Sequence, residues 1–242
     1  MLKLFVLVVA VAGCGASDEP PKPLAAHYDD MYIASVPLDQ KQSMITTQQD
    51  WNVARMTNAN ADAQEKDAES QLHQAHNDQK AAQLGVDSAS SNKKSADASS
   101  DMNRINDATK QLNTARDLEK ASGARVRYLE AYVRYLRRYE RWSQENMYFH
   151  EAQYENAKAQ IGQHNNIAPK GVTYDSFPKQ MEDREHRTSS AKNNYESLMK
   201  SAQNERDNWI KLQTQADTEN GHPGTYWDPL GPKSANPSAN AP

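Results

Sequence analysis

Seven alanines recur at strict seven-residue intervals in the first half of the chain, and this repeat constrains the fold more than any other feature. They are Ala54, Ala61, Ala68, Ala75, Ala82, Ala89 and Ala96. Three residues before each alanine stand the complementary positions, which are Trp51, Asn58, Glu65, Leu72, Gln79, Val86 and Lys93. A four-three alternation kept over this length predicts a coiled-coil helix with a narrow seam.

The seam of this first helix is weak. Alanine lets two backbones approach closely but buries little area, and four of the seven complementary positions are polar. Pro37 suits a first helical position, and residues 38–122 contain no proline and one glycine, Gly85. We therefore expect one long heptad-repeat helix over 38–122. Its helix-forming tendency is lowest at Ser88–Ser100, where fraying is expected. The heptad phase shifts after Ala96, which predicts a stutter or a kink.

The segment that follows is richer in large apolar residues. One seam continues through Ile105, Ala108, Leu112, Ala115, Val126, Leu129, Val133 and Leu136. A second stripe runs beside it, formed by Tyr128, Tyr132, Tyr135, Tyr139, Trp142 and Phe149. Two adjacent apolar stripes predict a helix that contacts two neighbours.

A short loop divides this region in two. Asn165, Asn166, Pro169 and Gly171 favour turns, and Asp175 or Ser176 would cap a last helix running to about Thr218. Residues 123–219 are therefore predicted to form an antiparallel helical hairpin. The expected fold is all-α: an elongated coiled coil with a long N-terminal helix and this hairpin. Residues 220–242 read as a disordered tail, and docking of its two adjacent rings is left open.

The N-terminus carries an export signal. Lys3 precedes a short apolar run that ends in small residues before Cys14, the only cysteine. The run Val11, Ala12, Gly13, Cys14 resembles the bacterial lipobox. The resemblance implies a signal peptide over 1–13 and a cysteine that carries fatty acyl chains such as palmitate. Residues 14–37, with four prolines, are then expected to form a lipidated tether.

The resemblance also implies a location. Gly15 stands where enterobacterial lipoproteins retained in the inner membrane carry aspartate. We therefore expect a lipid-anchored protein of the cell envelope, at the outer membrane and facing the periplasm. A plain secretory leader in which Cys14 stands by chance is the alternative.

Composition points away from several functions. The formal net charge is −4 and only 37% of residues are apolar, so nucleic acid is not an expected partner. No phosphate loop or nucleophile elbow is present, and we expect neither an enzyme nor a cofactor. His73 and His76 share a helix face, but two histidines at this spacing are more often solvated surface than a metal site.

Six arginines interleave with the tyrosine stripe. They are Arg125, Arg127, Arg134, Arg137, Arg138 and Arg141. In one interpretation the tyrosines pack inside the bundle and the arginines pair with nearby glutamates. In the other, the stripe binds an envelope protein, a cell-wall polymer or lipid phosphates. The candidate partner-binding residues are Tyr128, Tyr132, Tyr135, Arg138, Tyr139 and Trp142.

The sequence thus favours a lipid-anchored structural spacer or scaffold, with self-association into a homo-oligomer left open. The alternative is a binding accessory subunit of an envelope transport or secretion machine. An aromatic stripe free on the monomer would favour the accessory subunit, and a stripe covered by the hairpin would favour the scaffold.

Overall fold

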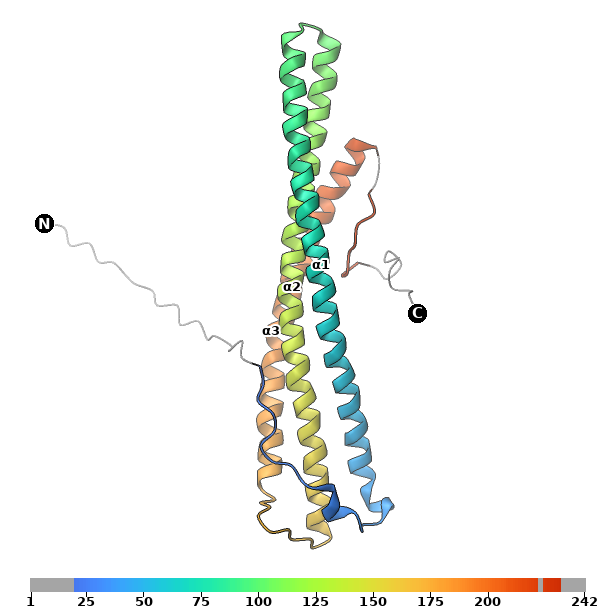
Figure 1. The fold of residues 1–242 in the computed structure, drawn as a ribbon, viewed down its shortest axis with the longest axis vertical. Helices are drawn as coiled ribbons and strands as arrows, with labels where there is room; N and C mark the ends of the chain where they lie inside the picture. The colour runs from blue at the N-terminus through green and yellow to red at the C-terminus, as the bar shows by residue number, and fades with distance from the viewer. Residues whose placement is uncertain (1–19, 222–223, 232–242) are drawn as a thin grey trace, which may run out of the picture.

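The computed structural model describes residues 20–221 and 224–231, and this part of the chain is helical without strands. Three long helices follow two short 3-10 helices: η1 (Asp30–Ile33), η2 (Leu38–Lys41), α1 (Gln42–Ala98), α2 (Met102–His164) and α3 (Ser176–Asn220). α2 lies between the other two and packs along both, so the molecule is an elongated bundle (Figure 1). The predicted all-α class, with a long first helix and two packed helices, is confirmed.

The long first helix is shorter than expected. The chain reverses at Ser99–Asp101, so the stretch expected as one helix over 38–122 is divided between α1 and α2, which lie antiparallel (Figure 1). Ser100 has a left-handed φ of 57°, and the Asp101 side chain caps α2 by accepting hydrogen bonds from the N–H groups of Asn103 and Arg104. The phase shift after Ala96 is therefore this reversal, and neither a stutter nor a kink.

The alanine seam faces α2 as its heptad spacing predicts. Six of the seven alanines are buried, and Ala82 is half-buried. Ser143, which is fully buried, donates a hydrogen bond of 2.9 Å to the side-chain oxygen of Asn58. Nearer the turn between α1 and α2, Arg125 of α2 contacts Asp78 of α1 at 2.7 Å. These contacts set the antiparallel register. Gly123 lies inside α2, where a Cβ would come within 3.3 Å of the Gln79 side chain, so glycine permits the close approach of α1.

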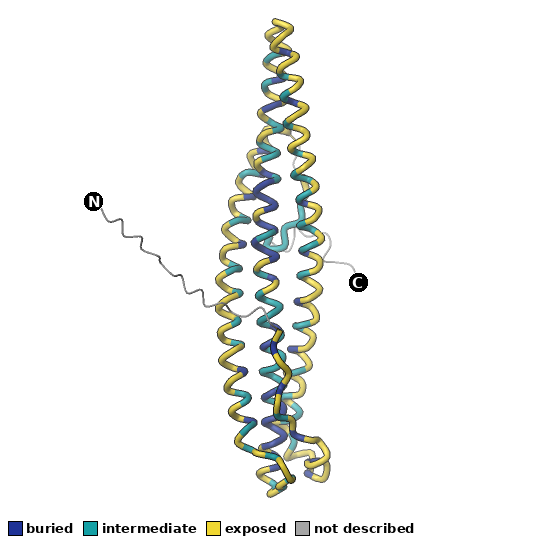
Figure 2. Tube along the Cα trace, turned by 60° about the vertical axis from the view of Figure 1, so that its left-hand side comes forward, coloured by how far each residue is buried: buried dark blue, intermediate teal, exposed yellow. Residues whose placement is uncertain are grey.

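The second hairpin turns within the predicted loop, but its first helix begins at Met102 and not near 123. α2 ends at His164, and the loop turns through Asn166 and Gly171, which have positive φ values of 56° and 85°. α3 ends at Asn220, and the left-handed φ of 72° at the capping residue Gly221 lets its N–H bond to the Asp217 carbonyl. The apolar residues of α2 are buried between α1 and α3, so α2 carries most of the core (Figure 2).

Two segments expected to be loose are packed on the bundle. Residues 20–36, expected as part of a tether, run along α2 and α3, and Tyr28 is 1% exposed (Figure 1). Residues 224–231, expected as part of a disordered tail, contact α2 and α3. The predicted signal peptide and Cys14 lie outside the described residues. Within the described chain, no helix has the combination of length and hydropathy needed to cross a membrane.

Candidate functional site

Most of the predicted aromatic stripe packs within the bundle: Tyr128 and Tyr132 are buried, and the other four members are half-buried. Tyr128 stacks on Trp209 of α3, with ring centroids 5.4 Å apart and planes inclined by 12°. Tyr139 and Trp142 both contact Tyr195 of α3, at 5.4 and 5.2 Å between ring centroids. The stripe therefore packs against α3 of its own chain, as the first interpretation expected.

Burial changes the chemistry of these phenols. It raises the pKa of Tyr132 from 10.0 to about 12, with a further contribution from the charge of Asp67. Burial also raises the pKa of Tyr128 and of Tyr135 well above the ordinary value. These tyrosines are neutral packing groups at any physiological pH.

The C-terminal segment 224–231 covers the upper part of the stripe. Asp228 accepts hydrogen bonds from the Tyr128 hydroxyl at 2.9 Å and from Arg206 Nε and Nη2 at 2.9 and 2.7 Å. Trp227 presents an edge to Tyr132 at 5.9 Å between ring centroids. This segment connects α2 to α3 through Asp228. The sequence did not predict that role, because the residues around the segment are rich in Gly, Pro, Asn and Ser, which is typical of disordered tails.

The N-terminal segment is held by charged side chains of the lower bundle. The backbone N–H of Tyr28 donates to Glu155. Lys158, whose side chain is 6% exposed, contacts Glu155 and Asp30 at 2.9 Å each. Burial opposes protonation of Lys158, but hydrogen bonds to the two carboxylates outweigh it and raise its pKa. Sequence reasoning missed Glu155 and Lys158 because Tyr28 and Asp30, which they hold, stand 127 and 128 residues away in the chain.

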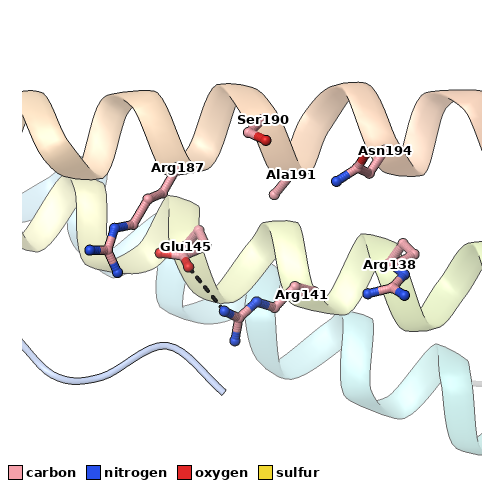
Figure 3. Close-up of a pocket in the computed structure, with 7 residues that line it drawn as sticks. All are labelled: Arg138, Arg141, Glu145, Arg187, Ser190, Ala191 and Asn194. Atoms are coloured by element: carbon pink, nitrogen blue, oxygen red, sulfur yellow. Dashed lines mark hydrogen bonds and ion pairs between the residues drawn. The ribbon is translucent and has the colours of Figure 1, made fainter. Parts of the chain in front are cut away.

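The candidate functional site is the arginine groove, by which we mean two adjoining hollows between α2, α3 and the N-terminal segment. Figure 3 shows the first hollow, which is lined by Arg138, Arg141, Glu145, Arg187, Ser190, Ala191 and Asn194. The second, of about 670 Å³, is lined by Pro20, Arg134, Arg137, Arg138, Glu140, Arg141, Gln144 and Leu198. Arg138 and Arg141 border both hollows.

Several arginines of the groove have carboxylate partners. Arg141 contacts Glu145 at 3.3 Å, and the buried Arg184 contacts the other oxygen of Glu145 at 3.1 Å. Arg137 reaches across to Glu65 and Glu69 of α1 at 3.2 and 2.7 Å. Arg138, the one arginine among the candidate partner-binding residues, has an interaction partner as well.

The remaining groups make the groove a mixed but mainly basic surface. Arg134 is exposed and makes no ion pair with the residues that the structure describes. Burial, together with the nearby charges of Glu65 and Asp62, raises the pKa of Glu140. A guanidinium with one carboxylate partner keeps further N–H donors for an oxyanion. The groove therefore suits phosphate or carboxylate groups.

The two histidines of α1 stand apart from this groove. His73 is exposed and His76 is half-buried. Across residues 20–221 and 224–231, no three histidine, cysteine or acidic side chains come together as a metal site would require.

Comparison with known proteins assigns no family. No protein-family model matches the chain, and no curated protein or solved structure is significantly similar to it.

Proposed function

We propose that this chain is a bacterial lipoprotein, anchored through acylated Cys14, whose helical bundle acts as a structural spacer or scaffold in the cell envelope. The proposed location is the outer membrane, facing the periplasm. The proposed role is structural, with no catalytic step and no cofactor.

One observation carries the structural part of the proposal. The aromatic stripe of α2, which was the candidate partner-binding surface, packs against Tyr195, Trp209 and Trp227. A stripe packed in this way stabilises an elongated body and leaves only part of its surface open to a partner. The four lipobox-like residues before and at Cys14 support the anchor.

An accessory subunit of an envelope machine is the second candidate. It is favoured by the arginine groove, where α2 and α3 present guanidinium groups on an accessible hollow. Such a subunit would use the groove in place of the aromatic stripe.

Labelling with a clickable fatty acid tests the anchor. Cys14→Ala should abolish labelling and release the protein from membranes, because no other cysteine is present. Ser17→Ala, just outside the four-residue motif, serves as the matched control and should label normally. Continued labelling of Cys14→Ala would overturn the lipoprotein proposal.

A matched deletion tests the spacer. Contacts between Asn58 and Ser143 and between Asp78 and Arg125 place residues 86–92 of α1 beside 110–116 of α2. Deleting both stretches removes one heptad from each helix, keeps the register, and shortens the hairpin by about 10 Å. Photocrosslinkers at Ser100 and Lys170 in whole envelopes then report partners at the two ends. A spacer should lose partners at Ser100 only, whereas partners that persist at Ser100 would argue against a length-dependent role.

A further inference from the structure

The described chain begins on the side of the bundle and not at one of its ends. Pro20 lines the second hollow of the arginine groove together with Arg141. The carbonyl groups of Lys22 and Pro23 accept hydrogen bonds from Arg184, the side chain that also pairs with Glu145. From there the segment runs along the bundle toward the α2–α3 loop (Figure 1). The N-terminal chain therefore joins the bundle beside Arg141.

Chain length limits how far the bundle can stand from its anchor. Only residues 15–19 separate Cys14 from Pro20, and this stretch spans at most about 22 Å when fully extended. At ~1.5 Å per residue, α2 extends about 35 Å from Arg141 to His164 and about 60 Å from Arg141 back to Met102. Both distances exceed the reach of residues 15–19.

An upright bundle is thus incompatible with a docked N-terminal segment. Were the α2–α3 loop to rest on the membrane, Pro20 would lie about 35 Å above it, which the chain from Cys14 cannot cover. We propose that the anchored bundle lies along the membrane surface, with the arginine groove against the phosphates of anionic lipids. This inference rests on the acylation of Cys14 proposed above.

The charges of the groove fit this orientation. Five arginines and two glutamates line its two hollows. Arg134 is exposed, and the side chain of Arg137 remains 58% exposed despite its contacts with α1. Each basic side chain close to an anionic membrane strengthens the contact about fivefold. The groove lies on the side where the chain from Cys14 joins the bundle, so anchor and charge act on the same face.

One competitor for the guanidinium groups belongs to the chain itself. Asp18 and Glu19 directly precede Pro20 in the sequence. If these carboxylates fill the groove, lipid phosphate is excluded from it, and replacing them would admit lipid. Asp18→Asn combined with Glu19→Gln therefore separates the two occupants.

The first experiment measures orientation on the full chain, acylated in a bacterial host and reconstituted in vesicles containing phosphatidylglycerol. A donor dye is placed on Ser100→Cys at the α1–α2 turn or on Lys170→Cys at the α2–α3 loop. Energy transfer to acceptors on lipid headgroups should be similar from both positions. Efficient transfer from one end and weak transfer from the other would show an upright bundle and overturn the inference.

The second experiment measures contact at the groove. A fluorophore on Asn194→Cys, which lines the first hollow, should be quenched by spin-labelled headgroups. Arg134→Glu should weaken this contact roughly tenfold in anionic vesicles, since it removes one attraction and adds a repulsion. Lys94→Glu, an exposed lysine of α1 near the Ser100 turn, is the matched control and should leave quenching unchanged.

The outcomes separate this inference from the proposed function. Acylated protein with an unquenched Asn194 probe would overturn the inference while leaving the lipoprotein assignment intact. Quenching that appears only in the Asp18→Asn, Glu19→Gln variant would show that the chain's own carboxylates occupy the groove, and would also overturn it. Protein without acyl chains would remove both proposals together.

Discussion

Asp228 accepts hydrogen bonds from Arg206 through both carboxylate oxygens. Arg206 Nε lies 2.9 Å from each oxygen, and Arg206 Nη2 lies 2.7 Å from Asp228 Oδ2. The same carboxylate accepts a hydrogen bond from the Tyr128 hydroxyl of α2. Arg206 belongs to α3, so one side chain of the C-terminal segment joins two helices. Hydrogen bonding to Asp228 raises the pKa of Arg206 and keeps it charged.

Asp228→Asn should therefore loosen the upper end of the α2–α3 pair. The substitution removes the charge from a mostly buried bidentate contact, and we expect a loss of about 1.5–3 kcal/mol in the free energy of unfolding. Denaturant unfolding followed by tryptophan fluorescence would measure it, because Trp209 and Trp227 lie nearby. Asp207→Asn is the control: Asp207 contacts Arg206 at 3.6 Å but is 74% exposed, so its loss should cost about 0–1 kcal/mol. Equal effects would contradict the role of Asp228.

Gly162→Ala should undock the N-terminal segment. A Cβ at position 162 would overlap the hydroxyl of Tyr28, which is buried against α2. Tyr28 must then leave its site, and protease cleavage within residues 20–36 should become faster. Gly85→Ala is the matched control, because a Cβ there meets open space, and alanine in a helix interior should stabilise by about 0.8–1 kcal/mol. Unchanged protection of residues 20–36 in Gly162→Ala would refute the docked arrangement.

Alkaline pH should destabilise the bundle through its buried tyrosines. The pKa of Tyr132 is raised from 10.0 to about 12, so between these values the folded state keeps a proton that the unfolded state releases. The corresponding stability is fully present below pH 10 and is lost as the pH rises to 12.

Tyr132→Phe should remove this part of the pH dependence, on the order of 2 kcal/mol, while keeping the ring packed. Urea unfolding at pH 9 and pH 12 would measure the difference. Tyr32→Phe, which changes an exposed tyrosine, is the control. A pH dependence that is identical in Tyr132→Phe and the unmodified chain would exclude this origin.

Local periodicity predicted the parts of the fold that depend on local pattern. The heptad alanines identified the seam of α1, and the turn-forming residues after His164 predicted the loop between α2 and α3. The reversal at Ser99–Asp101 escaped notice because it contains neither glycine nor proline. Serine and aspartate also occur throughout the preceding helix, so their turn and capping roles appear only when Ser100 adopts a positive φ.

The contacts that build the candidate site were inaccessible to the same reasoning. Tyr28 bonds to Glu155 across 127 residues, and Tyr128 bonds to Asp228 across 100. No periodic pattern relates positions so far apart. The aromatic stripe itself was visible in the sequence, but α3 and residues 224–231, which cover it, could be assigned to it only from the structure.

Stability should be uneven along the α1–α2 hairpin. Its upper end projects beyond α3, where each helix has only the other as a neighbour (Figure 1). Burial of a large side chain contributes about 1.5–3 kcal/mol, whereas an alanine methyl contributes roughly a third of that or less. Residues 80–104, where α1 contributes chiefly Ala82, Ala89 and Ala96 to the seam, should therefore open locally and exchange their amide hydrogens fastest among the helices. The α2 residues from 124 to 161, packed between α1 and α3, should exchange slowest.

Hydrogen exchange resolved by peptide would measure both regions in one experiment. Uniformly slow exchange from 40 to 160 would show instead that a second copy of the chain covers the faces of this hairpin that lie outside its alanine seam, and the protein would then be an obligate coiled-coil oligomer.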